Sequence, residues 1–420
     1  MSNQQETKSD QGKSLTSSPK TSDQGINSPK QTPKEAKDYE VVNYASFDDM
    51  NLKPDILKGI YSYGFEKPST IQQKAIVPLA KGYDIIAQSQ SGTGKTGTFA
   101  IGILEKIDFM QECTQALILA PTRELASQIH SVISALGSHV ENLRIKLSIG
   151  GVRGKEYSRW DKPKEHHIII GTPGRVLDNI NRRKVYIDKL KVFALDEADE
   201  MLSRGFVDQM YDIFQHIPLN CQVALFSATM PSEVLELSKK FIKNPINILV
   251  KREELTLEGI KQFYVGLEQR SHKVDTLIDL FETISVTQCI IFINKKRDAE
   301  ELYDILTEQG FGVSLITGSM QQEDRNKVIK SFRSGGTRVL LTTGLLARGF
   351  DVQQVSLVIN FDLPRDRESY IHSSGRCGRW GRKGCVINLV TEQEYSHLKE
   401  IEKFYNTQIE ELPMNIGDYL

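Results

Sequence analysis

The sequence predicts an α/β protein with two parallel-sheet domains in tandem. Short apolar runs alternate with segments whose apolar residues are spaced by three and four, which is the pattern of βαβ units. The alternation stops over residues 251–259, a charged segment that ends in glycine, and then starts again. The 420 residues are enough for two ordinary domains and a tail. We therefore expect a first domain over residues 41–250, a linker over 251–259 and a second domain over 260–420.

Residues 1–40 form the predicted tail. The first 38 or so are rich in Ser, Gln, Lys, Asp and Pro and nearly lack large apolar side chains. Such a segment cannot bury enough apolar surface to offset the entropy lost on ordering, so we expect it to be disordered.

The expected strands are apolar runs of buried-strand length. In the first domain they cover residues 84–87, 116–120, 146–149, 167–170, 192–195 and 222–226, and in the second 289–293, 313–316, 338–341, 356–360 and 386–390. Helical spacing covers residues 122–136, 298–309 and 323–332. Near-continuous apolar strands are typical of parallel sheets covered by helices on both faces.

A phosphate-binding loop follows the first expected strand. Its residues are Ser89, Gln90, Ser91, Gly92, Thr93, Gly94, Lys95 and Thr96. Small residues let backbone N–H groups face phosphate oxygens, and the helix that follows adds the positive end of its dipole. Lys95 can reach the β- and γ-phosphates, and the Thr96 hydroxyl can hold Mg²⁺. The alternative is a Ser/Gly/Thr turn that binds nothing, but Gly-Lys-Thr directly after a strand is specific.

An acidic cluster, Asp196-Glu197-Ala198-Asp199, follows the strand expected at 192–195. Three crowded carboxylates are costly unless a cation lies beside them. We assign Asp196 to the surroundings of Mg²⁺ as the Walker-B acid, and Glu197 to the water that attacks the γ-phosphorus. The alternative is a solvated acidic turn, which the upstream phosphate-binding loop disfavours.

Other loops after strands of the first domain carry free N–H groups, hydroxyls and arginines. These groups suit contacts to a nucleic-acid backbone, although each loop alone could be an ordinary turn. The candidates are Pro121, Thr122, Arg123, Gly151, Thr172, Gly174 and Arg175. The Ser227-Ala228-Thr229 segment also ends a strand and can hydrogen-bond the acidic cluster.

Two arginines of the second domain are candidates for stabilising a transferring phosphoryl group. Arg376 and Arg379 lie three residues apart and would share a face if the segment were helical. The alternative is a basic helix that contacts only RNA or water.

From about Phe47 to its C-terminus, the chain resembles the DEAD-box RNA helicases. The resemblance rests on residues 64–72 (GFEKPSTIQ), the phosphate-binding loop, 121–126 (PTRELA), 172–175 (TPGR), 196–199 (DEAD), 227–229 (SAT) and 375–379 (GRCGR). Residues 195–206, 251–260 and 404–407 are particularly similar to the members that act in translation initiation.

The resemblance implies two RecA-like domains with ATP and Mg²⁺ at their interface. It implies that Phe65 stacks on adenine, that Lys67 and Gln72 read the adenine edge, and that Asp351 contacts the ribose. Arg376 and Arg379 would contact the γ-phosphate. RNA would lie on the first-domain loops and on Arg325 and Thr343 of the second domain.

The resemblance also implies an RNA-stimulated ATP hydrolase that unwinds short duplexes locally. A helical-repeat scaffold of the initiation factor 4G kind is the expected protein partner, and the chain alone is expected to be a monomer.

Three positions depart from the family pattern, all in the second domain. Ser373 replaces the usual Arg after His372, Gly344 stands where the initiation factors have Asp, and Thr317 precedes Gly318 where His is usual. These changes remove polar or charged groups. They leave open an alternative, in which the protein is an ATP-gated RNA clamp or scaffold with weak turnover.

Composition excludes several other classes. No run approaches the roughly 20 apolar residues of a membrane helix, and no signal peptide is recognisable. The five cysteines lack metal-ligand spacing, which is typical of a reducing compartment, so we expect a cytoplasmic protein without excluding the nucleus. The net charge is −1, so nucleic-acid binding requires a local basic surface.

Overall fold

A computed structural model describes residues 39–90, 92–151, 165–202, 205–242, 244–249, 260–284, 288–344, 355–377 and 384–413. They belong to one compact unit of the chain, Pro33–Leu420. The predicted disordered tail up to residue 38, the linker at 251–259, Ser91, Asp351 and Arg379 lie outside the described residues.

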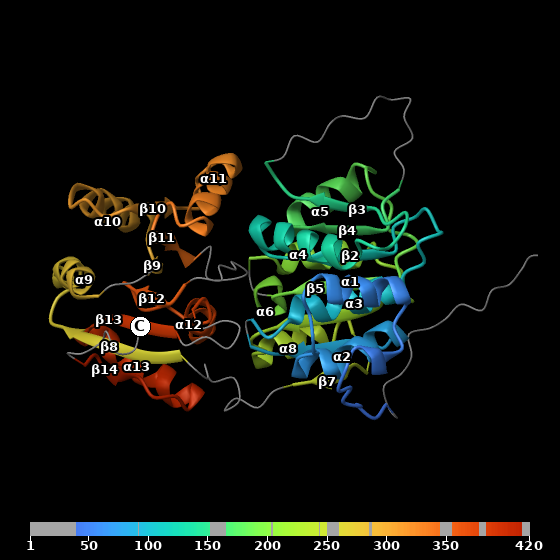
Figure 1. Ribbon diagram of the computed structural model, residues 1–420, viewed down its shortest axis with the longest axis horizontal. Helices are drawn as coiled ribbons and strands as arrows, with labels where there is room; N and C mark the ends of the chain where they lie inside the picture. Colours follow the sequence, from blue (N-terminus) through green and yellow to red (C-terminus); the bar gives the residue numbers. More distant parts are fainter. Residues whose placement is uncertain are drawn as a thin grey trace, which may run out of the picture. The chain divides into compact units, whose positions relative to one another are not determined.

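The first sheet has seven parallel strands in the order β3-β4-β2-β5-β6-β1-β7 (Figure 1). The strands are β1 (Ile85–Gln88), β2 (Ala116–Leu119), β3 (Ile145–Ser148), β4 (Ile168–Gly171), β5 (Val192–Asp196), β6 (Gln222–Ser227) and β7 (Ile246–Ile248). The helices are α1 (Pro54–Ser62), α2 (Thr70–Lys81), α3 (Lys95–Lys106), α4 (Arg123–Leu136), α5 (Pro173–Asn181), α6 (Ala198–Met201), α7 (Val207–Phe214) and α8 (Ser232–Ser238).

In the five inner strands of this sheet, alternate residues enter two different apolar cores. On β5, Val192 and Ala194 pack with α1–α4, whereas Phe193 and Leu195 pack with α5–α8. Because both faces are covered, the strands read in the sequence as continuous apolar runs rather than as an alternation.

The second sheet repeats this plan with the order β10-β11-β9-β12-β13-β8-β14, also all parallel. Its strands are β8 (Ile260–Leu267), β9 (Cys289–Ile293), β10 (Val313–Ile316), β11 (Val339–Thr343), β12 (Leu357–Asn360), β13 (Gly384–Thr391) and β14 (Glu410–Glu411). Its helices are α9 (His272–Thr283), α10 (Lys296–Glu308), α11 (Gln322–Arg333), α12 (Arg367–Ser374) and α13 (Glu392–Tyr405).

The helices of the second half again divide between the two faces of the sheet. Helices α9 and α10 pack on one apolar core, whereas α11 packs on the core of the other face. Helices α12 and α13 share a third, smaller core that includes Tyr370, Leu398 and Tyr405.

The eleven predicted strands are all present, within one or two residues at most ends, and so are the three predicted helices. Strands β7, β8 and β14 were not predicted. The predicted domain boundaries at residues 41, 250 and 260 stay a prediction. All five cysteines are buried and free, as expected of small apolar side chains. Among the described residues, none of the helices has the length and apolar character needed to span a membrane.

Helix α1 packs closely against the end of α4 through Gly59. A methyl group at this position would lie 1.9 Å from the backbone oxygen of Leu136, which no side-chain movement can relieve. We therefore expect Gly59→Ala to destabilise the protein by about 1–3 kcal/mol, measured by urea unfolding. Gly205→Ala is the control, because no atom of the described residues lies within 4 Å of the added methyl group there. Equal midpoints for the two variants would contradict this packing.

Candidate functional site

The candidate residues of the first domain lie along one edge of its sheet. Since all seven strands are parallel, the loops that follow them meet at the carboxyl edge. The loops after β1, β5 and β6 hold the phosphate-binding loop, the acidic cluster and Ser227–Thr229. The loops after β2, β3 and β4 hold the arginine- and glycine-containing candidates. Strand order therefore divides this edge into two contiguous halves, one for each predicted set.

In the phosphate-binding loop, the lysine side chain donates hydrogen bonds to the backbone of the loop itself. Lys95 is buried, and its Nζ donates to the carbonyl oxygens of Ser89 at 2.7 Å and Gln90 at 3.0 Å. Gly92 and Gly94 have positive φ angles of 83° and 96°, a conformation that glycine adopts readily. No side chain caps the N-terminus of α3, where Gly94 is the N-cap residue. This arrangement suits an anion at the helix N-terminus.

The acidic cluster is buried at the end of β5. Asp196 is 3% exposed and its Oδ1 accepts from the Glu197 N–H at 3.0 Å. Burial, reinforced by the neighbouring Glu197, raises the pKa of Asp196 to about 7, although Lys95 opposes the shift. Glu197 has a left-handed backbone (φ 52°), and its buried Oε2 has no hydrogen-bond partner among the described residues.

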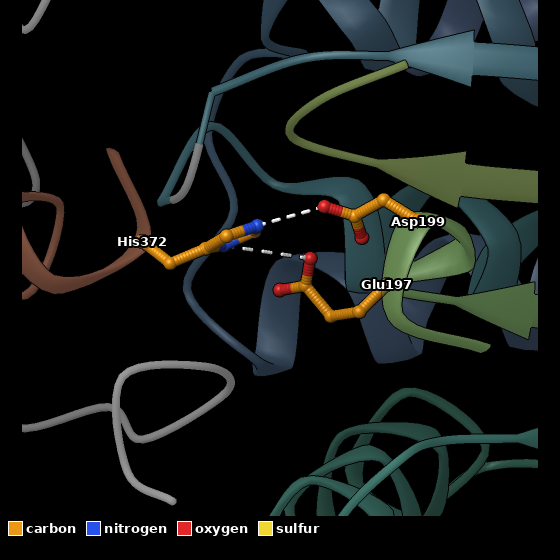
Figure 2. Close-up of side chains that lie close together, drawn as sticks. All are labelled: Glu197, Asp199 and His372. Atoms are coloured by element: carbon orange, nitrogen blue, oxygen red, sulfur yellow. Dashed lines mark hydrogen bonds and ion pairs between the residues drawn. The ribbon is translucent and has the colours of Figure 1, made fainter. Parts of the chain in front are cut away.

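Asp199 joins the acidic cluster to two other segments, of which Figure 2 shows the one that carries His372. Its Oδ1 accepts from the Ser227 hydroxyl at 2.7 Å and its Oδ2 from the Thr229 hydroxyl, as predicted for that segment. Its Oδ2 also lies 2.9 Å from Nε2 of His372, which comes from α12 of the second sheet. The other ring nitrogen of His372 lies 3.8 Å from Oε2 of Glu197. Helix α12 of the second half therefore contacts the acidic cluster of the first half directly.

The donor set of this cluster fits a hard divalent cation. Thr96, in the first turn of α3, and Asp196 both offer oxygen atoms, which Mg²⁺ prefers, and a buried carboxyl group with a raised pKa gains from a nearby cation. Glu197, Asp199 and His372 also bring possible ligand atoms within 4.8 Å of one another. Both oxygens of Asp199 already accept hydrogen bonds, so this group of three is a poorer site for a cation. We therefore keep the prediction that Mg²⁺ binds near Thr96 and Asp196.

The predicted adenine site lies beside the phosphate-binding loop. Gln72 accepts from the Ser69 N–H at 2.8 Å through Oε1, in a capping box that begins α2. A methyl group on Gly97 would lie 2.9 Å both from Nε2 of Gln72 and from the Phe65 ring, so both side chains touch α3. Phe65 stacks with Phe47 at a centroid distance of 6.3 Å. The predicted base-reading residue Lys67 is exposed.

The predicted RNA-binding residues after β2 and β4 begin helices. Thr122 is the N-cap of α4, and its Oγ1 accepts from the Leu125 N–H at 3.2 Å. Thr172 is the N-cap of α5 without a side-chain cap bond. Arg175 is half-buried and lies 3.4 Å from the Asp178 carboxylate, while Pro121 is half-buried and Gly174 exposed.

A second junction between the sheets involves the PTRELA segment. Arg325 of α11 forms a buried ion pair with Glu124 of α4, with 2.9 Å between Nη1 and Oε1. Arg123 donates to Gln322 at 3.3 Å and packs on Gly151, where a methyl group would lie 2.8 Å from its guanidinium. Two predicted RNA-binding arginines, Arg123 and Arg325, therefore already make contacts between the sheets.

In the second domain, helix α12 ends at Ser374, before Arg376. Arg376 is therefore not helical, and it does not share a helical face with Arg379 as the spacing suggested. The Arg376 side chain is 2% exposed and its Nε donates to the carbonyl oxygen of His372 at 2.9 Å. The guanidinium group is thus held inside the protein by the turn that carries the histidine.

The three departures from the family pattern have different surroundings. Ser373 is buried and its hydroxyl donates to the Tyr370 carbonyl oxygen, within its own helix. Thr317 is buried, with its hydroxyl 3.2 Å from that of Ser319. Gly344 is exposed, next to the half-buried Thr343 at the end of β11, and no described atom lies within 4 Å of an added methyl group.

Comparisons with known proteins agree with this geometry. A family model described as DEAD/DEAH box helicase matches residues 69–237, and one described as helicase conserved C-terminal domain matches residues 272–381. The ATP-dependent RNA helicase eIF4A of Neurospora crassa is 57% identical over 377 residues, which are 89% of this chain and 94% of that protein.

Solved structures share the fold. Dbp5 of S. cerevisiae bound to RNA and ADP BeF3 is 36% identical, with a TM-score of 0.83 over 89% of this chain and 97% of that one. Mss116p bound to ssRNA and AMP-PNP is 26% identical, with a TM-score of 0.78 over 90% of this chain and 81% of that one. These likenesses confirm the prediction of tandem RecA-like domains.

The chain therefore belongs to the DEAD/DEAH box helicase family, whose members hydrolyse ATP. Within that family it is similar to eIF4A, as the sequence motifs indicated.

Sequence reasoning did not predict that His372, Asp199 and Glu124 would make contacts between the two halves of the chain. A signal for His372 was present: it precedes Arg376 by four residues in the same motif. No sequence signal marked the contact of Glu124, since its partner Arg325 lies 201 residues away.

Gly97 of α3 lies against two side chains of the predicted adenine site. Gly97→Ala should displace Phe65 and Gln72, because the methyl group would approach both within 2.9 Å. We expect the Kd for ATP to rise about tenfold, as for the loss of a well-packed contact. Fluorescent ATP-analogue titration measures it, with Gly205→Ala as the control. An unchanged Kd would show that neither side chain contributes to nucleotide affinity.

Proposed function

We propose that the protein is an ATP-dependent RNA helicase, in which RNA stimulates ATP hydrolysis and hydrolysis is coupled to local unwinding of short duplexes. One observation carries the proposal: the hydrogen bond between Asp199 and His372, which connects the acidic cluster to the segment that holds Arg376. A nucleotide beside this junction would gain contacts from both domains at once.

ATP would bind through the phosphate-binding loop and would take Lys95 away from the Ser89 and Gln90 carbonyl groups. When bound, Mg²⁺ near Thr96 and Asp196 would neutralise phosphate charge. Glu197 would orient and deprotonate the attacking water, for which its Oε2 is available. Arg376, with Arg379, would stabilise the negative charge of the transferring phosphoryl group.

RNA would bind along the loops after β2, β3 and β4, next to the Glu124–Arg325 ion pair. Dbp5 and Mss116p were both solved with RNA, which supports RNA as the partner here. Because Arg123 and Arg325 hold the two sheets together on this side, RNA and ATP would favour the same closed arrangement. Two ligands that stabilise one state bind cooperatively.

Similarity to eIF4A supports a role in translation initiation in the cytoplasm. A helical-repeat scaffold of the initiation factor 4G kind would then be the protein partner, and the chain alone would be a monomer.

A second candidate is an RNA clamp that closes on ATP but turns over poorly. Two features favour it: the Ser373 hydroxyl bonds within its own helix, and Gly344 offers no side chain at the end of β11. The helicase proposal is preferred because the residues expected to carry hydrolysis, Lys95, Glu197, Arg376 and Arg379, are all present.

The role of Glu197 gives the first prediction here. Glu197→Gln keeps the shape of the side chain but removes the base, so kcat for ATP hydrolysis should fall by about 10²–10⁴-fold with little change in ATP affinity. A phosphate-release assay and an ATP titration measure the two quantities. Glu233→Gln, an exposed acid on α8, should behave as wild type. Substantial turnover in Glu197→Gln would exclude this residue as the base.

RNA stimulation separates the helicase from the clamp. We expect single-stranded RNA to raise the ATPase rate of the wild type severalfold, and a short RNA duplex to be separated in the presence of ATP. The clamp predicts no stimulation in the wild type but stimulation in Gly344→Asp, where no described atom lies within 4 Å of an added methyl group. Gly312→Asp, which adds the same charge at another open glycine of this domain, is the control.

A further inference from the structure

A chain of buried polar side chains lies beneath α12. Tyr370, on α12, is fully buried, and its hydroxyl donates to Oε1 of Gln262 on β8 at 2.8 Å. The same hydroxyl accepts from Nδ2 of Asn388 on β13 at 3.4 Å. Strands β8 and β13 are neighbours, so one tyrosine ties the helix to two adjacent strands.

The chain extends beyond Tyr370 in both directions. Gln262 donates through Nε2 to the hydroxyl of Thr407, which follows α13, at 2.7 Å. Asn388 accepts from Nδ2 of Asn360 on β12 at 2.8 Å, and these two asparagines are register partners in the sheet. Gln262 is 5% exposed, and Asn360, Asn388 and Tyr370 are 0% exposed.

Such a network costs desolvation energy that an apolar core would avoid, so stability alone does not account for it. What hydrogen bonds add to packing is direction, because their strength depends on distance and angle. Burial also raises the pKa of Tyr370 well above its usual value, which keeps the hydroxyl protonated and able to donate to Gln262.

The network connects directly to the residues that face the acidic cluster. Tyr370 precedes His372 by two residues in the eight-residue helix α12, and His372 bonds Asp199. The backbone carbonyl oxygen of Tyr370 accepts from the Ser373 hydroxyl, and that of His372 accepts from Nε of Arg376. Displacement of α12 would therefore move the histidine and the arginine together.

We propose that Tyr370 is a positioning residue: through Gln262 and Asn388 it holds α12 so that His372 and Arg376 reach the acidic cluster of the first domain. The inference rests on the proposed ATPase function, but it assigns a role to residues outside the proposed nucleotide and RNA sites. Because ATP would bind mainly through the first domain, loss of this positioning should slow turnover more than it weakens ATP binding.

Tyr370→Phe is the direct test, since it removes only the hydroxyl. We expect kcat of RNA-stimulated ATP hydrolysis to fall about tenfold while KM for ATP stays within about twofold. Gln262→Met removes the acceptor of the Tyr370 hydroxyl and should likewise lower kcat with little change in KM. The second variant keeps the test valid if the first folds poorly. Tyr405→Phe is the matched control, because Tyr405 is a buried tyrosine of the same apolar core outside this network. Melting temperatures are measured for all three.

Wild-type kcat in both Tyr370→Phe and Gln262→Met would overturn the inference. So would a rise in KM without a change in kcat, or an equal loss of kcat in Tyr405→Phe, since each would indicate a merely structural role. Failure of the proposed function is distinguishable, because the wild type itself would then show no RNA-stimulated hydrolysis.

Discussion

The buried carboxylate of Asp199 is the group on which the rest of the site depends. A charge inside a protein must be matched by donors, and Asp199 draws them from three places: Ser227, Thr229 and His372. Two of these donors belong to the same sheet as the acidic cluster and one to the other sheet. Whatever moves the second sheet away from the first leaves this carboxylate with one donor fewer, so the chemistry of the acidic cluster and the arrangement of the domains cannot vary independently.

The carboxyl edge of the first sheet shows why the two predicted functions can be coupled over a short distance. The acidic cluster follows β5 and the PTRELA segment follows β2, and these strands are hydrogen-bonded neighbours. Each carries a contact to the second sheet, through Asp199 on one side and Glu124 on the other. The two contacts are therefore adjacent along the same edge of the sheet.

Much of this could be read from the sequence, for a physical reason. A strand buried on both faces must be apolar throughout, so runs such as residues 192–195 stand out, and parallel strands bring the loops behind them to one edge. The strands β7, β8 and β14 escaped because they are short or only partly buried: β7 has three residues, β8 mixes buried and accessible positions, and β14 has two residues, both exposed. The pairing of Glu124 with Arg325 and of Tyr370 with Gln262 escaped because nothing local marks two polar residues as future neighbours across more than 100 positions.

The tether between Lys95 and the carbonyl oxygens of Ser89 and Gln90 has a thermodynamic consequence. If ATP binds at this loop as we propose, its phosphates would meet an ammonium group that already donates to two carbonyl oxygens. The net gain would then be an exchange of two neutral acceptors for anionic ones rather than a new interaction, which would lower the affinity. When ADP leaves, the same two carbonyl oxygens would again accept from Lys95, so its buried positive charge would not lose all its partners. A lower affinity for ATP and an easier release of ADP would both favour repeated turnover.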